Sequence, residues 1–113
     1  MTTLSIETDK TQSVAVMKVS GRVDSETAPD LDSALTALLK ENNNKIVIDL
    51  QNVNYLSSAG LRAMAKALKD AQRAGGDVYL ASVSEPVGVI LLTVGMLQMF
   101  KVFPNSEEAV AGF

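Results

Sequence analysis

Three short apolar runs, each followed by a segment of helical character, constrain the fold of this chain more than any other feature of its sequence. SVAVMKVSG (residues 13–21), KIVIDL (45–50) and DVYLASV (77–83) are rich in β-branched residues, and KIVIDL is typical of a strand buried on both faces. A further strand, LSIETD (4–9), precedes the first run across a short polar turn. Because strands joined through helices run parallel, this order predicts an N-terminal hairpin followed by a mainly parallel sheet. We therefore expect an α/β fold in which residues 1–113 form a single domain with three to four helices.

Polar residues mark where each helix is expected to begin, and asparagines or glycines mark where it ends. The expected caps are, in chain order, Thr27, Ser57 or Ser58, and Ser84, and a last helical turn opens at Ser106. Asn42 to Asn44 follow the first helix, Gly75 and Gly76 the second, and Gly95 the third. The core-facing residues of the first two helices recur at helical spacing: Leu31, Leu35, Leu38, Leu61, Met64 and Leu68.

The third helix leaves two alternatives open, because it is apolar on more than one side. Its inner face is predicted to hold Val87, Ile90, Leu91 and Val94, so that Val89, Leu92 and Met96 point elsewhere. Either the C-terminal segment with Phe100, Phe103 and Phe113 buries the second side, or that side is a surface for weak self-association or for a partner.

The composition excludes several classes of function. The chain has no cysteine and no histidine, which removes thiol chemistry and the commonest metal ligand and general base, so we expect no metal site and no cofactor. A net charge of −3 without a cluster of lysine or arginine disfavours nucleic acid as a partner. The first ten residues lack the features of a signal peptide, and no stretch reaches the roughly 20 apolar residues of a membrane span. These features favour a cytoplasmic protein without a membrane partner.

The segment NYLSSAGLRAM (54–64) places two hydroxyls at the start of the second helix, where the parallel topology gathers Asp24, Ser57, Ser58, Ser84 and Glu85 at one edge of the sheet. Ser57 or Ser58 can serve simply as the helix cap. A nucleophilic Ser58 is disfavoured, because Lys66 lies two turns further on and no histidine exists to activate it. A third interpretation is a phosphate acceptor, since a helix N-terminus tolerates the added negative charge.

Gly60 stands out in the same segment, because a glycine inside the first turn of a helix costs about 1 kcal/mol relative to alanine. A close approach by another backbone or by a partner would explain it.

The segments SGRVD, IVIDLQNVNYLSSAGLRAM, GGDVYLASVSEPV and VGMLQMFKVFPNSEEAV together resemble the bacterial anti-sigma factor antagonists of the STAS family, from about Leu4 to the C-terminus. The resemblance implies a STAS-like domain that is not an enzyme. Such a domain binds an anti-sigma factor, a serine kinase of the histidine-kinase-like ATPase type, and so frees a sigma factor. It also implies that the kinase phosphorylates the antagonist, which blocks rebinding, and that a serine phosphatase reverses this step.

The resemblance also implies roles for particular residues. Aligning the family's Gly-Leu with Gly60 and Leu61 puts the phosphoserine on Ser58, with Ser57 as a secondary acceptor, and Asp24 matches the acidic residue of the neighbouring loop. Ser57 stands where the family usually has aspartate, which removes a fixed negative charge beside the acceptor. The residues expected to contact the partner are Asp24, Ser57, Ser58, Gly60, Arg62 and Ser84.

Two other functions remain as alternatives. The same fold can serve as a subunit of a stressosome-like assembly or of a lipid-transport ATPase. A small enzyme that uses Ser58 is disfavoured by the absence of histidine and cysteine.

Overall fold

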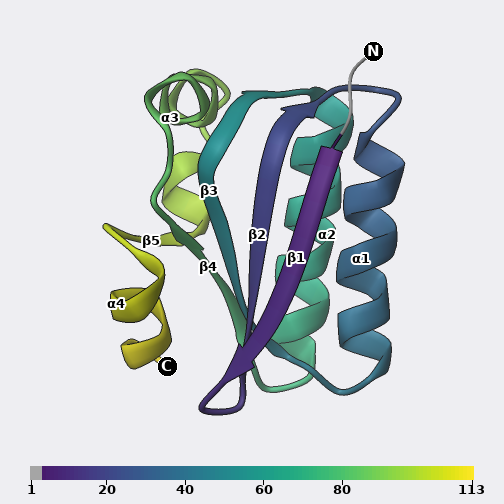
Figure 1. Ribbon diagram of the computed structural model, residues 1–113, viewed down its shortest axis with the longest axis vertical. Coiled ribbons are helices and arrows are strands. Elements are labelled where there is room, and N and C mark those ends of the chain that lie inside the picture. Colours follow the sequence, from purple (N-terminus) through teal and green to yellow (C-terminus); the bar gives the residue numbers. More distant parts are fainter. Residues whose placement is uncertain (1–3) are drawn as a thin grey trace.

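The strands of the sheet lie in the order of the sequence, β1-β2-β3-β4-β5, in a computed structural model that describes residues 4–113 (Figure 1). β1 (Leu4–Thr11) is antiparallel to β2 (Val14–Val23). β3 (Lys45–Leu56), β4 (Asp77–Ala81) and β5 (Lys101–Phe103) follow, each parallel to its neighbour. The predicted N-terminal hairpin and mainly parallel sheet are thus confirmed. The predicted domain extent includes residues 1–3, which lie outside the described residues.

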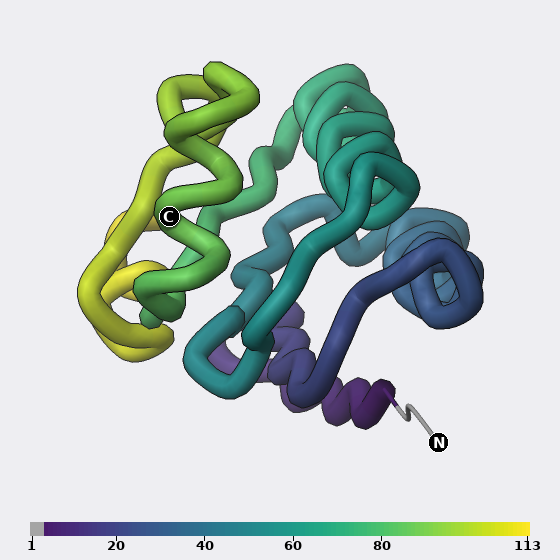
Figure 2. The backbone as a smooth tube through the Cα atoms, turned by 90° about the horizontal axis from the view of Figure 1, so that it is seen from above, coloured from purple at the N-terminus to yellow at the C-terminus, as the bar shows by residue number. Residues whose placement is uncertain are grey.

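Helices cover both faces of the sheet. α1 (Ala28–Lys40) and α2 (Ser58–Arg73) pack side by side on one face, as Figures 1 and 2 show. α3 (Glu85–Thr93) contacts β3 and leads through a 3₁₀ turn, Leu97–Met99, into β5. α4 (Ser106–Ala111) lies against the opposite face. All six residues predicted to face the core from the first two helices are buried.

The core has two layers because the sheet is apolar on both sides. Ile46, Ile48 and the other strand residues of one face pack under α1 and α2. Val47 and its neighbours on the other face pack under α4, where the Tyr79 ring stacks on Phe113 with centroids 3.9 Å apart. This two-sided burial of the central strand is what the continuous apolar run KIVIDL predicts.

β3 is longer than predicted and runs on to Leu56 instead of ending at Leu50. Its second half pairs with the end of β2 across two register shifts, one of which lies at Gly21 and Arg22. Gly21 has a φ of +114°, a conformation that residues with a side chain rarely adopt. The bulged pairing carries β2 and β3 together up to the loops that precede α1 and α2.

The N-caps of three helices lie at the predicted positions, but only one of the three hydroxyls accepts a hydrogen bond from its helix. Ser57 accepts a hydrogen bond from the helix that follows it, whereas the hydroxyls of Thr27 and Ser84 bond elsewhere. The last helix begins at Ser106 as predicted, and Asn105 before it is the N-cap, whose side chain accepts from the Glu108 N–H.

One prediction for α3 is wrong and one alternative is excluded. Val94 is 51% exposed instead of facing the core, because it follows the last residue of the helix. Val89 and Leu92 are 58% and 68% exposed. The C-terminal aromatics do not cover them, since Phe100 packs in the core beneath the helices and Phe103 and Phe113 lie on the α4 side.

Two further results bear on function. In the part of the chain that the structure describes, no helix is long and apolar enough to cross a membrane. No group of three or more aspartate or glutamate side chains within residues 4–113 is arranged to hold a metal ion.

Candidate functional site

The loops that follow β2, β3 and β4 share one edge of the sheet, because these strands are parallel. Figure 2 looks down on this edge. The Ser57 N–H donates to the Val23 carbonyl at 2.8 Å, which ties the start of α2 to the end of β2. The Ser84 hydroxyl donates to the Val53 carbonyl and ties the start of α3 to β3. Asp24, Ser58 and Ser84 therefore lie on the same edge, and the Asp24 loop is directly beside the start of α2.

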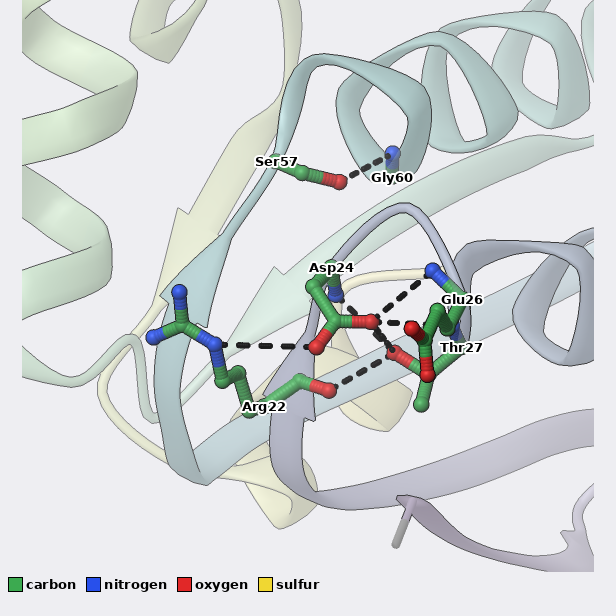
Figure 3. Close-up of polar contacts among 6 residues, drawn as sticks. All are labelled: Arg22, Asp24, Glu26, Thr27, Ser57 and Gly60. Atoms are coloured by element: carbon green, nitrogen blue, oxygen red, sulfur yellow. Dashed lines mark hydrogen bonds and ion pairs between the residues drawn. The ribbon is translucent and has the colours of Figure 1, made fainter. Parts of the chain in front are cut away.

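The two adjacent serines differ in what their hydroxyls do. Ser57 is the N-cap of α2, and its Oγ accepts from the Gly60 N–H at 3.3 Å (Figure 3). Ser58 is the first helical residue and is exposed, and its hydroxyl makes no hydrogen bond to residues 4–113. The cap interpretation thus applies to Ser57, and Ser58 presents a free hydroxyl at a helix N-terminus.

Asp24 organises the loop between β2 and α1. Its Oδ1 accepts from the backbone N–H groups of Glu26 at 2.9 Å and Thr27 at 3.0 Å. The buried Thr27 hydroxyl donates to the Arg22 carbonyl at 2.7 Å and accepts from the Asp24 N–H at 2.9 Å, which explains why it does not cap the helix. Figure 3 shows the carboxylate enclosed by these groups.

Arg22 supplies a cation beside this carboxylate. Its Nε lies 3.6 Å from Asp24 Oδ2, and its guanidinium lies 4.0 Å from the centroid of the Tyr55 ring. Arg22 and Tyr55 are neighbours in the β2–β3 pairing, so the bulge at Gly21 sets this contact. The side chain is 49% exposed, which leaves part of the guanidinium open to solvent.

The pKa of Asp24 lies below its ordinary value. The hydrogen bond from the Thr27 backbone N–H lowers the pKa most, partial desolvation opposes it, and the Glu26 N–H, the Thr27 hydroxyl and Arg22 lower it further. These donors all favour the charged form. The edge therefore carries a fixed negative charge beside the start of α2 at neutral pH.

Gly60, which was expected among the partner contacts, is buried in the first turn of α2. A Cβ at this position would lie 2.6 Å from Val23 Cγ1 and 2.9 Å from Leu56 Cδ1. The glycine therefore lets the first turn of α2 approach the ends of β2 and β3. The close approach expected for Gly60 is real, but the neighbours are core side chains.

The remaining predicted contact residues lie on either side of Ser58. Arg62 is exposed one helical turn after Ser58 and lines a shallow groove between α1 and α2, together with Ser25, Asp32 and Ala59. Ser84 is only partly exposed, and its hydroxyl is occupied by the Val53 carbonyl. Ser84 thus positions α3, and its hydroxyl proton is used within the fold.

Sequence reasoning missed three features of this edge. These are Arg22, Tyr55 and the hydrogen bonds by which the Thr27 hydroxyl holds the Asp24 loop. The spacing of Asp24 and Thr27 is a usable signal, because aspartate commonly bonds the backbone two or three residues on. The contact between Arg22 and Tyr55 has no such signal, since it depends on a register that shifts at the bulge.

The arrangement suits recognition better than catalysis. None of the carboxylates or amines in residues 4–113 is hydrogen-bonded to Ser58. A serine–carboxylate hydrogen bond is found instead at α4, where the Ser106 hydroxyl donates to Asp49 Oδ2 of β3 at 2.8 Å. The edge thus offers an exposed hydroxyl, an ionised carboxylate and two exposed arginines.

Comparisons with known proteins agree with this architecture. An anti-sigma-B factor antagonist of Staphylococcus aureus is 29% identical over 104 residues, which cover 92% of this chain and 96% of that protein. The crystal structure of an anti-sigma factor antagonist from Mycobacterium paratuberculosis superposes with a TM-score of 0.88 at 24% identity, covering 97% of this chain and 93% of that one. SpoIIAA, a Bacillus cell fate determinant solved in its phosphorylated form, has a TM-score of 0.75 at 13% identity, covering 95% and 97%.

These structural likenesses show a shared fold. The model of one family, the STAS domain, matches residues 5–109, which is nearly the whole chain. This chain belongs to the STAS domain family.

Proposed function

We propose that this chain is an anti-sigma factor antagonist in a partner-switching system. It binds an anti-sigma factor that is also a serine kinase, through the edge formed by the Asp24 loop and the start of α2, and so frees a sigma factor. The names of the related antagonists support this role. The protein acts as a binding module in the cytoplasm, and the kinase and a serine phosphatase carry out the chemistry.

The free hydroxyl of Ser58 carries the proposal. It is exposed at the first position of a long helix and makes no hydrogen bond within residues 4–113, whereas the Ser57 hydroxyl caps the helix. A kinase can therefore reach Ser58 without unfolding any of the surrounding structure. SpoIIAA, which shares the fold, has been solved in a phosphorylated form, which supports a phosphorylated state for a domain of this shape.

Phosphorylation at Ser58 acts on binding more than on folding. The phosphate adds a charge of about −1.5 to −2, which the α2 N-terminus accommodates. At the interface the same charge must lose its water beside the ionised Asp24, which costs binding free energy. Arg62, one turn further along α2, is placed to pair with the phosphate and would then no longer be free for the partner.

Capture from a lysate of the source organism identifies the partner, with the wild-type chain and Ser58→Asp as parallel baits. We expect an ATPase of the histidine-kinase type on the wild-type bait and its loss on Ser58→Asp. Recovery of a transporter ATPase, equally on both baits, would contradict the proposal and favour the transporter-subunit alternative.

Phosphorylation of purified variants then assigns the acceptor. The captured kinase and ATP are incubated with wild type, Ser57→Ala and Ser58→Ala, and intact masses are followed over time. We expect one phosphoryl group on wild type and on Ser57→Ala, and none on Ser58→Ala. Equal modification of Ser58→Ala would exclude Ser58 as the acceptor.

A further inference from the structure

The charge of this acidic protein is unevenly distributed, and α2 is strongly basic. Ser58–Arg73 contains four of the chain's 10 lysines and arginines but only one of its 13 aspartates and glutamates. α2 therefore has a net charge of +3, whereas the whole chain has −3 and the residues outside α2 total −6. The four cations are three or four residues apart in the sequence, which is the spacing that brings side chains to one side of a helix.

All four cations lie along one exposed side of α2. We call Arg62, Lys66, Lys69 and Arg73 the α2 basic stripe. They follow Ser58 at successive intervals of four, four, three and four residues, so they stack along one face of the helix. All four side chains are exposed, and together they line a shallow hollow over Ala65.

The stripe is only partly neutralised within the protein. Lys66 Nζ lies 4.0 Å from Asp32 Oδ1 of α1, and Arg73 Nη1 lies 3.7 Å from Asp70 Oδ1 of the same helix. Neither Arg62 nor Lys69 has a carboxylate within 4.0 Å in the described part of the chain. Exposed pairs of this kind bind weakly and exchange easily with a partner's carboxylates.

We propose that the α2 basic stripe is a docking surface for an acidic surface of the anti-sigma factor, an inference that rests on the proposed function. The stripe begins one turn from Ser58, so a protein that covers the phosphate acceptor extends directly onto it. Its charge is opposite to that of the rest of the chain, and opposite charges steer association and fix the orientation of a complex.

An acidic protein surface fits this stripe better than nucleic acid or an anionic membrane does. Both of these present uniform negative charge over a wide area, and they would also meet the acidic residues that border α2. Asp32 lies on the adjacent helix, and Asp24 and Glu26 lie in the loop beside the helix start. A folded partner can place its carboxylates along the stripe alone.

The stripe also defines how a phosphate on Ser58 changes recognition. Ser58 and Arg62 are four residues apart on the helix, which is the spacing at which opposite charges pair. The phosphate therefore makes the start of the stripe, around Ser58 and Arg62, negatively charged. Lys66, Lys69 and Arg73 remain basic, so the phosphorylated chain retains a weaker, salt-sensitive attraction to the same partner.

Charge reversal on the stripe tests this proposal. Binding of the purified anti-sigma factor to Lys66→Glu/Lys69→Glu is compared with binding to Lys10→Glu/Lys101→Glu, which makes the same change of charge on β1 and β5. Association rates are measured between low and physiological salt. We expect the stripe variant to associate about tenfold more slowly at low salt and to lose most of the salt dependence, because reversed charges remove the steering. The control variant should associate at the wild-type rate and with the wild-type salt dependence.

The outcomes separate this inference from the function on which it rests. If wild type does not bind the anti-sigma factor, the proposed function fails. If wild type binds and both double variants associate at the wild-type rate with the same salt dependence, the stripe proposal alone is overturned. Binding of wild type, but not the stripe variant, to phosphatidylglycerol vesicles or to a DNA duplex at physiological salt would also overturn it. Circular dichroism and thermal unfolding confirm that each variant is folded.

Discussion

Asp24 is the residue that holds the loop beside the phosphate acceptor in one conformation. Its Oδ1 accepts from two backbone N–H groups, and its Oδ2 faces Arg22, which in turn lies over Tyr55. The carboxylate thus keeps the loop in shape and supplies a negative charge at the binding edge. Asparagine, which is neutral and has the same shape, separates the effect of the charge from the effect of the side chain's shape.

We predict that Asp24→Asn is less stable than wild type near neutral pH and that the difference disappears in acid. Because the folded-state pKa of Asp24 is lowered, the ionised form stabilises the native state above the unfolded-state pKa of about 3.9. This contribution is lost as the pH falls from that value through the lower folded-state pKa. Urea unfolding of both proteins between pH 7 and pH 3 measures the difference.

The matched control is Asp9→Asn, which changes an exposed carboxylate of β1 that makes no hydrogen bond to the described residues. Its stability should follow wild type across the pH range. A difference between Asp24→Asn and wild type that is the same at pH 3 and pH 7 would show that the charge of Asp24 does not stabilise the fold.

At the scale of the element, Gly60 determines how closely α2 approaches the ends of β2 and β3. Alanine at this position favours the helix by up to about 1 kcal/mol. Its Cβ would however lie 2.6 Å from Val23 Cγ1, and crowding of this kind costs about 1–3 kcal/mol. Val23 is β-branched and buried, so it cannot easily move aside.

We therefore predict that Gly60→Ala loses about 1 kcal/mol of unfolding free energy. Gly88→Ala in α3 is the control, because its Cβ would lie at an ordinary 3.7 Å from Val83 Cγ1. That variant should be neutral or more stable than wild type. Denaturant unfolding compares the two, and a Gly60→Ala protein as stable as Gly88→Ala would mean that α2 can move away without cost.

The elements also show what could be read from sequence and what could not. KIVIDL and the leucine spacing of α1 and α2 are strong periodic signals, and the order of strands and helices followed from them. QNVNYL after KIVIDL alternates polar and apolar residues, but it forms a strand only because the bulged end of β2 pairs with it. The same pairing creates the contact of Arg22 with Tyr55, so neither feature was predictable from local residues.

The candidate site was easier to predict than its supporting contacts. Parallel strands place Asp24 and Ser58 on one edge regardless of local detail, and the start of α2 follows from its cap. The role of Gly60 was harder, because a glycine that faces the core and one that faces a partner look alike in sequence. Arg62 was expected as a partner contact, and the structure shows it as the first member of the α2 basic stripe.

At the scale of the whole molecule, the exposed apolar side of α3 is a surface to which no binding partner has been assigned. Val89 and Leu92 are exposed, and residues 86–100 contain no charged side chain. Exclusion of the burial alternative leaves the surface for self-association or for a partner as a prediction. Light scattering at increasing concentration tests self-association, with Leu92→Lys expected to lower the apparent mass relative to wild type.

The control for that measurement is Ser33→Lys, which adds the same charge to an exposed position of α1. Its apparent mass should change with concentration as that of wild type does. A wild-type chain that stays monomeric at the highest concentration, with Leu92→Lys indistinguishable from it, would exclude self-association through α3.

Calorimetric titration of Ser58 variants against the purified anti-sigma factor tests the central claim, that charge at Ser58 switches partner binding. Ser58→Ala should bind as wild type does, because the exposed hydroxyl makes no hydrogen bond to the described part of the chain. Ser58→Asp should bind about a hundredfold more weakly or worse, because a charge must be desolvated beside Asp24. Ser33→Asp, which adds the same charge on α1, should bind normally, and all variants should unfold at similar denaturant concentrations. Equal dissociation constants for Ser58→Ala and Ser58→Asp would contradict the switch.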